Sequence, residues 1–449
     1  MIIRPSPRYS LFASSVRVLG VVILCGWGLR PAAGQNGDLF RSPAGSLTAW
    51  SKGKLKLSGE IRGRHERRAG QNFNGGPDLD VSLWRTRLTL SYQPNAWLKL
   101  AGTLQDSRAP GYGADGPASV RNAADLYEGY AELSQPGARG LSLSLGRRAL
   151  NYGDGKLIAT PNWGNVSRTF DHARLRYRTQ SADYDFLFAS PVKPRTDGWD
   201  RPVLGDHLWG FYSTFHGSEE ASQIELYVLR REQNRPGGFA PSGRLRINTA
   251  GGRWAGPLPD GWKGALEAAM QTGWVGPARH RASTWTGSVT RRWLMDGMPL
   301  DGSLEYKYAS GSKDPGDSSR SGTFDQLYFA GHDRFGHMDL FGWRNIHNVR
   351  LLWTLELTKS LTMIVMYNSW WLASRRDALY SGSGKAILRS PDGSAGSHVG
   401  QEWDLFGVYQ RKPLNFGLGA GRVLRGAFLR NLAPNLSPLY LYVSHTYTF

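Results

Sequence analysis

Arginine recurs at every second position in several short segments of the chain. Arg174, Arg176 and Arg178 alternate with apolar residues, and Arg85 and Arg87 have the same spacing. In an extended strand this spacing puts the guanidinium groups on one face. The planar guanidinium fork suits carboxylate and phosphate better than the ammonium group of lysine does. The pattern therefore predicts rows of anion-binding side chains on one face of a sheet.

The same alternation assigns further charged residues to this face: Lys54, Lys56, Glu60, Arg62, Arg64, Arg244, Arg246, Arg350 and Glu356. Acidic residues could neutralise arginines in a ladder of ion pairs, and Glu60, Glu128, Glu132 and Glu356 are the candidates. Any single arginine could therefore have a structural role. The chain has 55 basic and 36 acidic residues, so pairing cannot account for all of them.

Other chemistry is weakly represented. Histidines and aspartates occur between residues 314 and 347 without a compact metal-ligand spacing. Aspartates of that Gly- and Ser-rich loop could hold a hard cation, but a solvated loop is the simpler interpretation. Ser444 and His445 are adjacent in a strand and point to opposite faces, which argues against a nucleophile and base pair. We expect no enzyme activity and no cofactor.

The elements that must position the arginines are strands. Two-residue periodicity bounded by Gly, Pro, Asn or Asp predicts about 18 of them. They are expected near residues 54–64, 79–93, 96–108, 124–134, 140–150, 168–180, 183–192, 205–216, 222–234, 242–255, 262–275, 282–295, 299–311, 344–357, 360–372, 401–412, 415–426 and 438–449.

Short turns between these strands alternate with long polar loops. The long loops are expected near 65–78, 109–123, 151–167, 193–204, 235–241, 312–343, 373–400 and 427–437. Short periplasmic turns with long external loops are typical of outer-membrane barrels. After residue 34 no apolar run approaches the ~20 residues of a membrane-spanning helix. The sequence therefore predicts an all-β transmembrane antiparallel barrel rather than a soluble sandwich or propeller.

Both ends of the chain favour the same class. Alternation puts Leu441, Val443, Tyr447 and Phe449 on one face of the last strand, which resembles the terminal strand that the bacterial barrel-assembly machinery reads. A basic N-terminus, an apolar run and small residues predict a signal peptide over residues 1–34, which leaves 35–449 as the barrel domain. The only cysteine lies within that signal peptide.

About 18 strands enclose more space than their own side chains fill, which predicts a channel. The formal net charge is +19, and basic groups in a confined passage concentrate anions. The sequence pI of about 10.1 would also be compatible with nucleic-acid binding. The export signal and the dispersal of basic residues through strands exclude that class. Arginines near the outer loops could instead bind lipopolysaccharide phosphates.

Two blocks of sequence resemble the alginate-export outer-membrane proteins. The first runs from Leu145-Gly-Arg-Arg-Ala-Leu-Asn-Tyr-Gly-Asp154 through Trp163-Gly-Asn165 to Arg168-Thr-Phe-Asp-His-Ala-Arg-Leu175, and the second from Thr323 to Tyr380. The resemblance implies an 18-stranded monomeric barrel whose electropositive lumen conducts a uronic-acid polymer, with arginines contacting carboxylates. By motif position it implies constriction residues, namely Arg147 or Arg148, Asp154, Arg168, Asp171 and Arg174.

Taken together, the sequence predicts a passive outer-membrane channel that exports an anionic polysaccharide such as alginate or a related uronic-acid polymer. The alternative is a general anion- or oligosaccharide-preferring porin, and inward folding of loops 151–167 and 312–343 would separate the two. Expected partners are the polysaccharide, outer-membrane lipid with lipopolysaccharide, and the assembly machinery through Phe449, with no nucleic acid. The predicted lumen and substrate-binding residues are Arg62, Arg85, Arg87, Glu128, Arg147, Arg148, Asp154, Arg168, Asp171, Arg174, Arg176, Arg178, Arg244, Arg246 and Arg350.

Overall fold

The computed structural model describes residues 51–71, 73, 77–112, 116–196, 198–217, 222–234, 243–332 and 334–449. The predicted signal peptide, residues 1–34, lies outside the described residues. Within them, no helix combines the length and the apolar character needed to cross a membrane.

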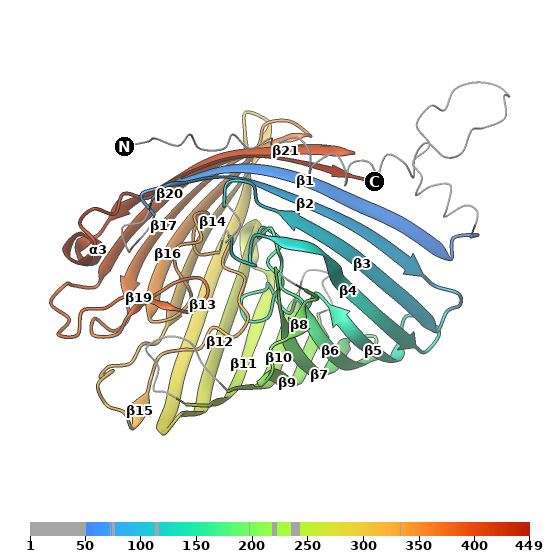
Figure 1. Cartoon of the computed structure of the whole chain (residues 1–449), viewed down its shortest axis with the longest axis horizontal. Coiled ribbons are helices and arrows are strands. Elements are labelled where there is room, and N and C mark those ends of the chain that lie inside the picture. The colour runs from blue at the N-terminus through green and yellow to red at the C-terminus, as the bar shows by residue number, and fades with distance from the viewer. Residues whose placement is uncertain are drawn as a thin grey trace, which may run out of the picture.

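The described strands form a barrel (Figure 1). Its wall has 18 long strands, each antiparallel to its neighbours, and β1 closes the barrel by pairing with β22. They are β1 (Leu55–Ala69), β2 (Leu79–Tyr92), β3 (Leu98–Arg108), β4 (Asn122–Ser134), β5 (Gly140–Arg148), β6 (Phe170–Arg178), β7 (Ala182–Lys193), β9 (Asp206–His216), β10 (Gln223–Gln233), β11 (Leu245–Pro257), β12 (Trp262–Val275), β13 (Ala278–Met295), β14 (Met298–Ala309), β16 (Ile346–Glu356), β17 (Leu361–Leu372), β20 (His398–Arg411), β21 (Leu414–Arg425) and β22 (Leu439–Thr448).

Small elements decorate the connections between wall strands. They are β8 (Arg201–Pro202), the 3-10 turn η1 (Pro259–Gly261), β15 (Arg320–Ser321), the hairpin of β18 (Leu379–Tyr380) and β19 (Ala386–Leu388), and α3 (Ala427–Leu432). β15 pairs in parallel with the start of β13.

The predicted all-β barrel of about 18 strands is confirmed, because every expected segment corresponds to a wall strand. One connection differs from the expected alternation of loop lengths. β12 and β13 are joined at the long-loop end by Gly276 and Pro277 alone. Gly276 has a φ of 56°, in the left-handed region that glycine adopts without steric cost. β13 therefore begins at Ala278 instead of residue 282, and its first residues belong to the wall.

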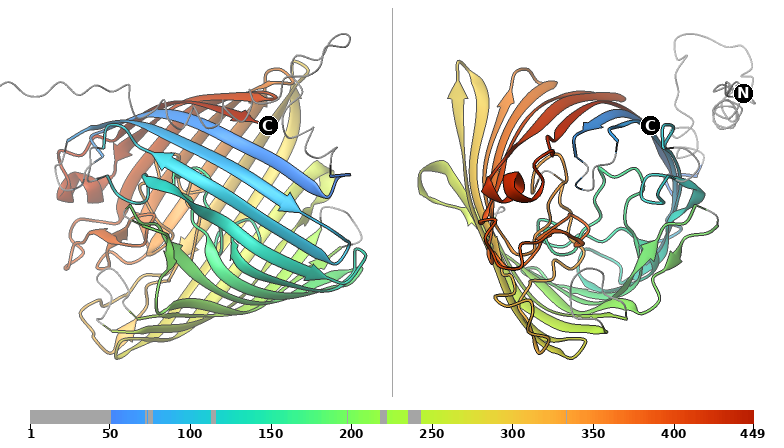
Figure 2. Two further views of the ribbon diagram at one scale, coloured as in Figure 1. Left: turned by 45° about the vertical axis from the view of Figure 1, so that its right-hand side comes forward. Right: turned by 60° about the vertical axis from the view of Figure 1, so that its left-hand side comes forward.

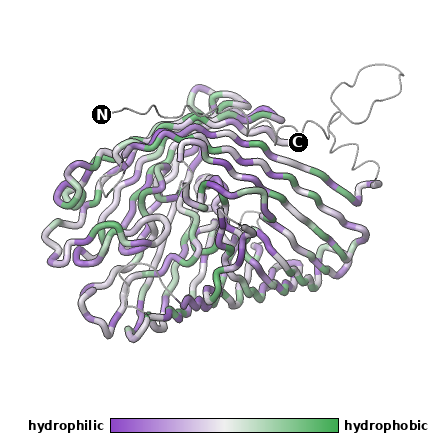
Figure 3. The backbone as a smooth tube through the Cα atoms, viewed as in Figure 1, coloured by the Kyte–Doolittle hydropathy of each residue, from purple (hydrophilic) through white to green (hydrophobic). Residues whose placement is uncertain are grey.

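Hydrophilic and hydrophobic residues alternate along many stretches of the wall strands (Figure 3). Successive side chains of a strand point to opposite faces of the sheet. On β2, Leu88 and Leu90 are exposed on the outer face, while Arg85 is 1% exposed and points inward. On β22, Leu441 and Val443 are exposed, while Tyr440 and Tyr442 are buried. The outer face is apolar where it would meet lipid, as expected for a transmembrane barrel.

Two long loops fold into the barrel interior. They are the β5–β6 loop, residues 149–169, and the β14–β16 loop, residues 310–345. A view along the barrel shows coil segments crossing its interior (Figure 2). The loops contact each other through a bridge between Ile158 and Tyr328. Apolar side chains of the second loop, such as Phe324 and Trp343, are fully buried. Part of the interior is therefore an apolar core made by loops.

Candidate substrate passage on the inner wall

Arginines of β1 hold the β5–β6 loop against the inner wall. Arg62 donates from Nη1 to the carbonyl oxygen of Asn162 at 2.8 Å, and from Nη2 to those of Trp163 at 3.0 Å and Gly164 at 2.9 Å. Arg64 donates to the same Trp163 carbonyl at 2.7 Å. These guanidinium groups hydrogen-bond to the backbone carbonyl oxygens of one turn, which lies about 100 residues away along the chain.

β2 contributes the other half of this anchor. Arg85 binds Glu60 through Nε at 2.9 Å and Nη2 at 2.7 Å, and its Nη1 reaches the carbonyl of Asn162 at 3.0 Å. Arg87 donates to the side chains of Asn162 at 2.8 Å and Ser167 at 3.1 Å. Most donors of Arg62, Arg85 and Arg87 are thus occupied by protein. Their geometry is that of a loop anchor.

A second group of inward arginines lies on β5 and β6. Arg176 forms a two-pronged ion pair with Asp185, both contacts at 2.6 Å. Glu132 accepts from Arg148 at 2.9 Å and lies 3.8 Å from Arg174. Arg178 pairs with Asp183 at 3.1 Å, and its side chain is 47% exposed.

Arg174, Arg176 and Arg178 lie on the face of β6 opposite to the exposed Leu175 and Tyr177, the face to which alternation assigns them. The pairing partners mean that these arginines also form the ladder that the sequence left open. Four guanidinium groups, those of Arg148, Arg174, Arg176 and Arg178, share three carboxylates, those of Glu132, Asp183 and Asp185. This group of side chains therefore has one more basic residue than acidic residues.

Arg350 and Asp154 belong to one buried network. Glu305 on β14 forms ion pairs with Arg350 at 3.0 Å, with Lys307 at 2.7 Å and with Lys156 at 3.1 Å. Lys156 also binds Asp154. Burial lowers the pKa of Lys156, but the carboxylates of Glu305 and Asp154 outweigh burial, so the net shift is upward and the ammonium stays charged. The network ties the β5–β6 loop to the far wall.

Arg168 joins the two inward loops. It donates to the carbonyl oxygens of Ala159 at 3.2 Å and Tyr328 at 2.7 Å. Burial lowers the pKa of Arg168 to about 10, which leaves it protonated at neutral pH. Glu128 has a similar local role, because it accepts the backbone N–H of Ala149 at 2.8 Å, where the loop leaves β5.

Four predicted lumen residues lie elsewhere. Arg147 and Asp171 pair at 2.7 Å on the outer side of β5 and β6, because consecutive strand residues face opposite ways and Arg148 takes the inward position. Arg246 also points outward, and Arg244 precedes β11 and pairs with Glu232 on that side.

The error at Arg246 has a clear cause. The inward prediction for Arg246 requires its apolar neighbours Leu245 and Ile247 to face lipid, yet these two residues are 4% and 0% exposed beneath the inward loops. An apolar strand face can be buried against a loop core as well as against lipid. Alternation alone cannot tell the two apart.

The alternative roles of other residues also resolve. Trp163 is stacked on His332, with ring centroids 4.3 Å apart, and the guanidinium group of Arg64 lies 3.9 Å from its ring centroid, so other side chains of the protein pack against this ring. Asp325, one of the possible cation ligands, pairs with Arg231 at 2.8 Å. Among the described residues no group of histidines, cysteines and carboxylates is arranged to hold a metal ion.

A basic cavity at the long-loop end was not found from the sequence. It has a volume of about 280 Å³ between the β14–β16 loop and the β17–β20 loop, and Arg344, Lys385 and Arg389 line it. Two carboxylates also line it: Asp325 pairs with Arg231, and Asp377 accepts a hydrogen bond from the hydroxyl of Thr323 at 2.5 Å. These basic residues lie in loops, where the two-residue periodicity that located the wall arginines does not apply. The local density of basic residues between 375 and 389 is the signal that could have found them.

Comparison with known proteins identifies one family and one fold. A family model described as alginate export matches residues 54–440. Among solved structures, Pseudomonas aeruginosa OccD3 (OpdP) has 13% sequence identity and a TM-score of 0.58 over 99% of both chains. P. aeruginosa OccK11 (OpdR) has 13% identity and a TM-score of 0.58, over 88% of this chain and 96% of that one.

A BenF-like porin from Pseudomonas fluorescens Pf-5 has 11% identity and a TM-score of 0.58, over 88% of this chain and 98% of that one. No curated protein matches the chain. At these identities the structural likeness establishes the fold, and the family match together with that fold places the protein in the bacterial outer membrane.

The loop anchor can be tested by removing one guanidinium. In Arg85→Met, Glu60 loses its buried partner and the Asn162 carbonyl loses a donor, so we expect the free energy of unfolding to fall by about 3–5 kcal/mol. Urea unfolding in detergent micelles, followed by tryptophan fluorescence, measures this. Arg178→Met is the matched control, because its pair is half exposed and should cost about 0–1 kcal/mol. Equal losses in both variants would contradict an anchoring role.

A second test concerns the β7–β8 connection. The backbone N–H of Asp200 donates to Oδ2 of Asp125 at 2.5 Å, and the carbonyl oxygen of Asp200 accepts from Arg147 at 3.2 Å. Burial raises the pKa of Asp200 to about 6, and the charge of Asp125 adds to the shift. The folded state therefore binds this proton more tightly than the unfolded state, so the contact is strongest below about pH 4 and weakens as the pH rises through about 6.

We expect the amide of Asp200, corrected for intrinsic rate, to exchange its hydrogen more slowly at pH 5 than at pH 7.5. In Asp200→Asn the corrected rate should be independent of pH. A wild-type amide without pH dependence would show that this carboxyl does not control the contact.

Proposed function

The chain belongs to the alginate-export family, and we propose that it is a passive outer-membrane channel for export of an anionic polysaccharide of the uronic-acid type. Family and fold are those of an outer-membrane channel. The polymer, the direction and the residues that contact it are the proposed part. Two observations support the proposal: basic side chains line the cavity at the long-loop end, and four arginines share three carboxylates on the inner faces of β5 and β6.

We divide the basic residues into two functional groups. Arg62, Arg85, Arg87 and Arg168 are anchors, since their donors are used by loop carbonyls and side chains. The proposed contacts to polymer are Arg174, Arg176 and Arg178 on the inner wall, with Arg344, Lys385 and Arg389 at the outer mouth.

Inner-wall arginines can serve transport even though they are paired. Arg178 is half exposed and Arg174 is 3.8 Å from its acid, so a passing carboxylate can exchange with Asp183 or Glu132 at small net cost. Exchange of this kind makes each contact weak and reversible, which conduction requires. The polymer moves down its own gradient, and the basic residues raise its local concentration in the passage.

The inward loops favour a selective passage over a wide general pore. Both loops that were expected to separate the two functions lie inside the barrel, and Arg168 and the Ile158–Tyr328 bridge join them. We further propose that the protein acts as a monomer and that β22, with Phe449, is the segment that the assembly machinery engages.

The alternative function is passage of small carboxylates. OpdK from Pseudomonas aeruginosa, at 14% identity and a TM-score of 0.58, was solved with vanillate, a small aromatic carboxylate. The cavity of about 280 Å³ at the outer mouth is also of a size suited to a small ligand. Polymer length separates the two functions, because only an extended path binds longer oligomers more tightly.

The test is electrical. In planar bilayers the mature chain should give an anion-selective conductance, and oligouronates should block it at concentrations that fall as the oligomer lengthens. Arg344→Gln/Lys385→Gln/Arg389→Gln should raise the blocking concentration about tenfold or more, since each lost contact to a charge is worth ~1.5–3 kcal/mol.

The matched control is Arg422→Gln, an exposed arginine on the outer face of β21, which should leave block and selectivity unchanged. Block that is independent of oligomer length would favour the small-carboxylate channel. A cation-selective or unselective conductance would refute both.

A further inference from the structure

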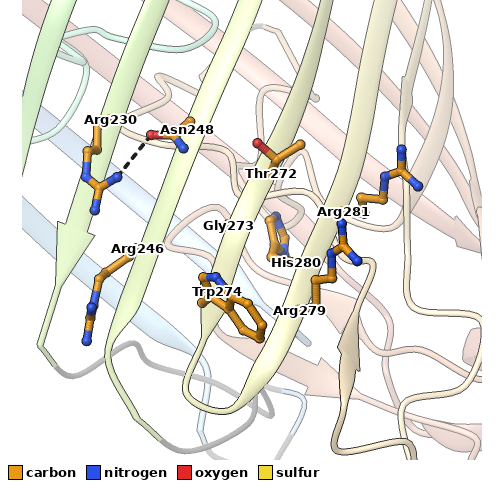
Figure 4. A pocket seen from close by; sticks show the side chains of 9 residues that line it. All are labelled: Arg230, Arg246, Asn248, Thr272, Gly273, Trp274, Arg279, His280 and Arg281. Carbon is orange, nitrogen blue, oxygen red and sulfur yellow. Dashed lines mark hydrogen bonds between the residues drawn. The ribbon is translucent and has the colours of Figure 1, made fainter.

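Four arginines form a cluster on the outer face of the barrel, where β10 to β13 reach their long-loop ends. Arg230, Arg246, Arg279 and Arg281 line one hollow of about 570 Å³, together with Asn248, Thr272 and Trp274 (Figure 4). We call these four residues the outer arginine cluster. They point away from the interior, so the proposed passage does not use them.

Strand register brings the cluster together. In one row across the wall, Arg230 lies opposite Asn248, which lies opposite Thr272, which lies opposite Arg281. In the next row towards the outer end, Trp274 lies between Arg246 and Arg279. Directly opposed residues have Cβ atoms ~4.5–5.5 Å apart. The short Gly276–Pro277 turn is essential here, because it keeps Arg279 and Arg281 within the wall.

The cluster has very little acidic compensation. Glu232 accepts from Arg230 at 2.9 Å and also binds Arg244. Within the part of the chain that the structure describes, no carboxylate lies within ion-pair distance of Arg246, Arg279 or Arg281. Like charges gathered around one hollow without counter-charges repel one another. Such an arrangement is explained if an anion normally neutralises it.

The position of the cluster identifies the kind of anion. The rows immediately towards the membrane centre carry exposed apolar side chains, including Val228 at 59%, Met270 at 61% and Leu226 at 50%. Trp274, at 53% exposed, lies within the cluster itself, as aromatic residues do at a membrane interface. A ligand here has its charge on the arginines and acyl chains on the apolar rows below.

We propose that the outer arginine cluster binds the phosphate groups of a phosphorylated glycolipid of the outer leaflet, that is, lipopolysaccharide through its lipid A part. Guanidinium forks bind phosphate with two parallel hydrogen bonds. Asn248 and Thr272 supply polar side chains at the centre of the cluster, suited to the sugar hydroxyls. The proposal depends on the outer-membrane location and is independent of what the channel conducts.

The experiment is a lipid titration by native mass spectrometry of the full mature barrel in detergent, without divalent cations that would mask phosphate. The probes are bisphosphorylated lipid A, its monophosphoryl form, and zwitterionic phosphatidylethanolamine. We expect bisphosphorylated lipid A to bind most tightly and phosphatidylethanolamine at least tenfold more weakly. Arg246→Gln/Arg279→Gln/Arg281→Gln should weaken lipid A binding at least tenfold.

The control variant is Arg291→Gln/Arg422→Gln, which removes two outer-face arginines, the partly exposed Arg291 at the opposite end of β13 and the exposed Arg422 on β21. It should change lipid A affinity less than twofold, and a heat-dependent gel shift verifies that both variants fold. Equal lipid A binding by the cluster variant and wild type would overturn the proposal.

Further outcomes decide the source of the anion. If inorganic phosphate displaces lipid A when the two are present at equal concentrations, the site binds a free anion and the lipid proposal is wrong. If phosphatidylethanolamine binds as tightly as lipid A, the arginines do not select phosphorylated glycolipid. No transported solute is present in this titration, so its result does not depend on the proposed channel function.

Discussion

In the hydrocarbon layer of a membrane, backbone N–H and C=O groups have no water to bind, so a sheet that crosses it must close on itself. The pairing of β1 with β22 satisfies this requirement. Once the wall is closed, each strand has one face towards lipid and one towards the interior. The distribution of charge in this protein follows from that division, because a guanidinium group is tolerated only where it finds partners or water.

Inside the barrel, those partners come from the chain itself. The arginines of β1 and β2 meet carbonyl oxygens of a loop that begins on β5, and those of β5 and β6 meet carboxylates of β4 and β7. One residue type therefore does two jobs. Arginines that are fully occupied hold the loop in place, and in the proposed function arginines with exposed or distant partners exchange with a passing anion.

The sequence specified the wall almost completely, since alternation and turn residues are local signals that survive without tertiary information. The direction of Arg174, Arg176 and Arg178 followed from the same signal. It failed at Arg246, where Leu245 and Ile247 are buried against inward loops instead of lipid. Alternation could not locate Arg344, Lys385 and Arg389 at the outer mouth, because these residues lie in long loops and the conformation of a long loop depends on contacts distant in sequence. Neither the apolar interior nor the anchoring of the β5–β6 loop could be derived from spacing.

The Ile158–Tyr328 bridge and the three carbonyl bonds of Arg168 make the two inward loops mechanically one body. Neither loop can swing aside alone without leaving a buried guanidinium group partly unsatisfied. Any widening for a bulky solute is therefore cooperative, and a single channel should switch between a few discrete current levels instead of dilating gradually.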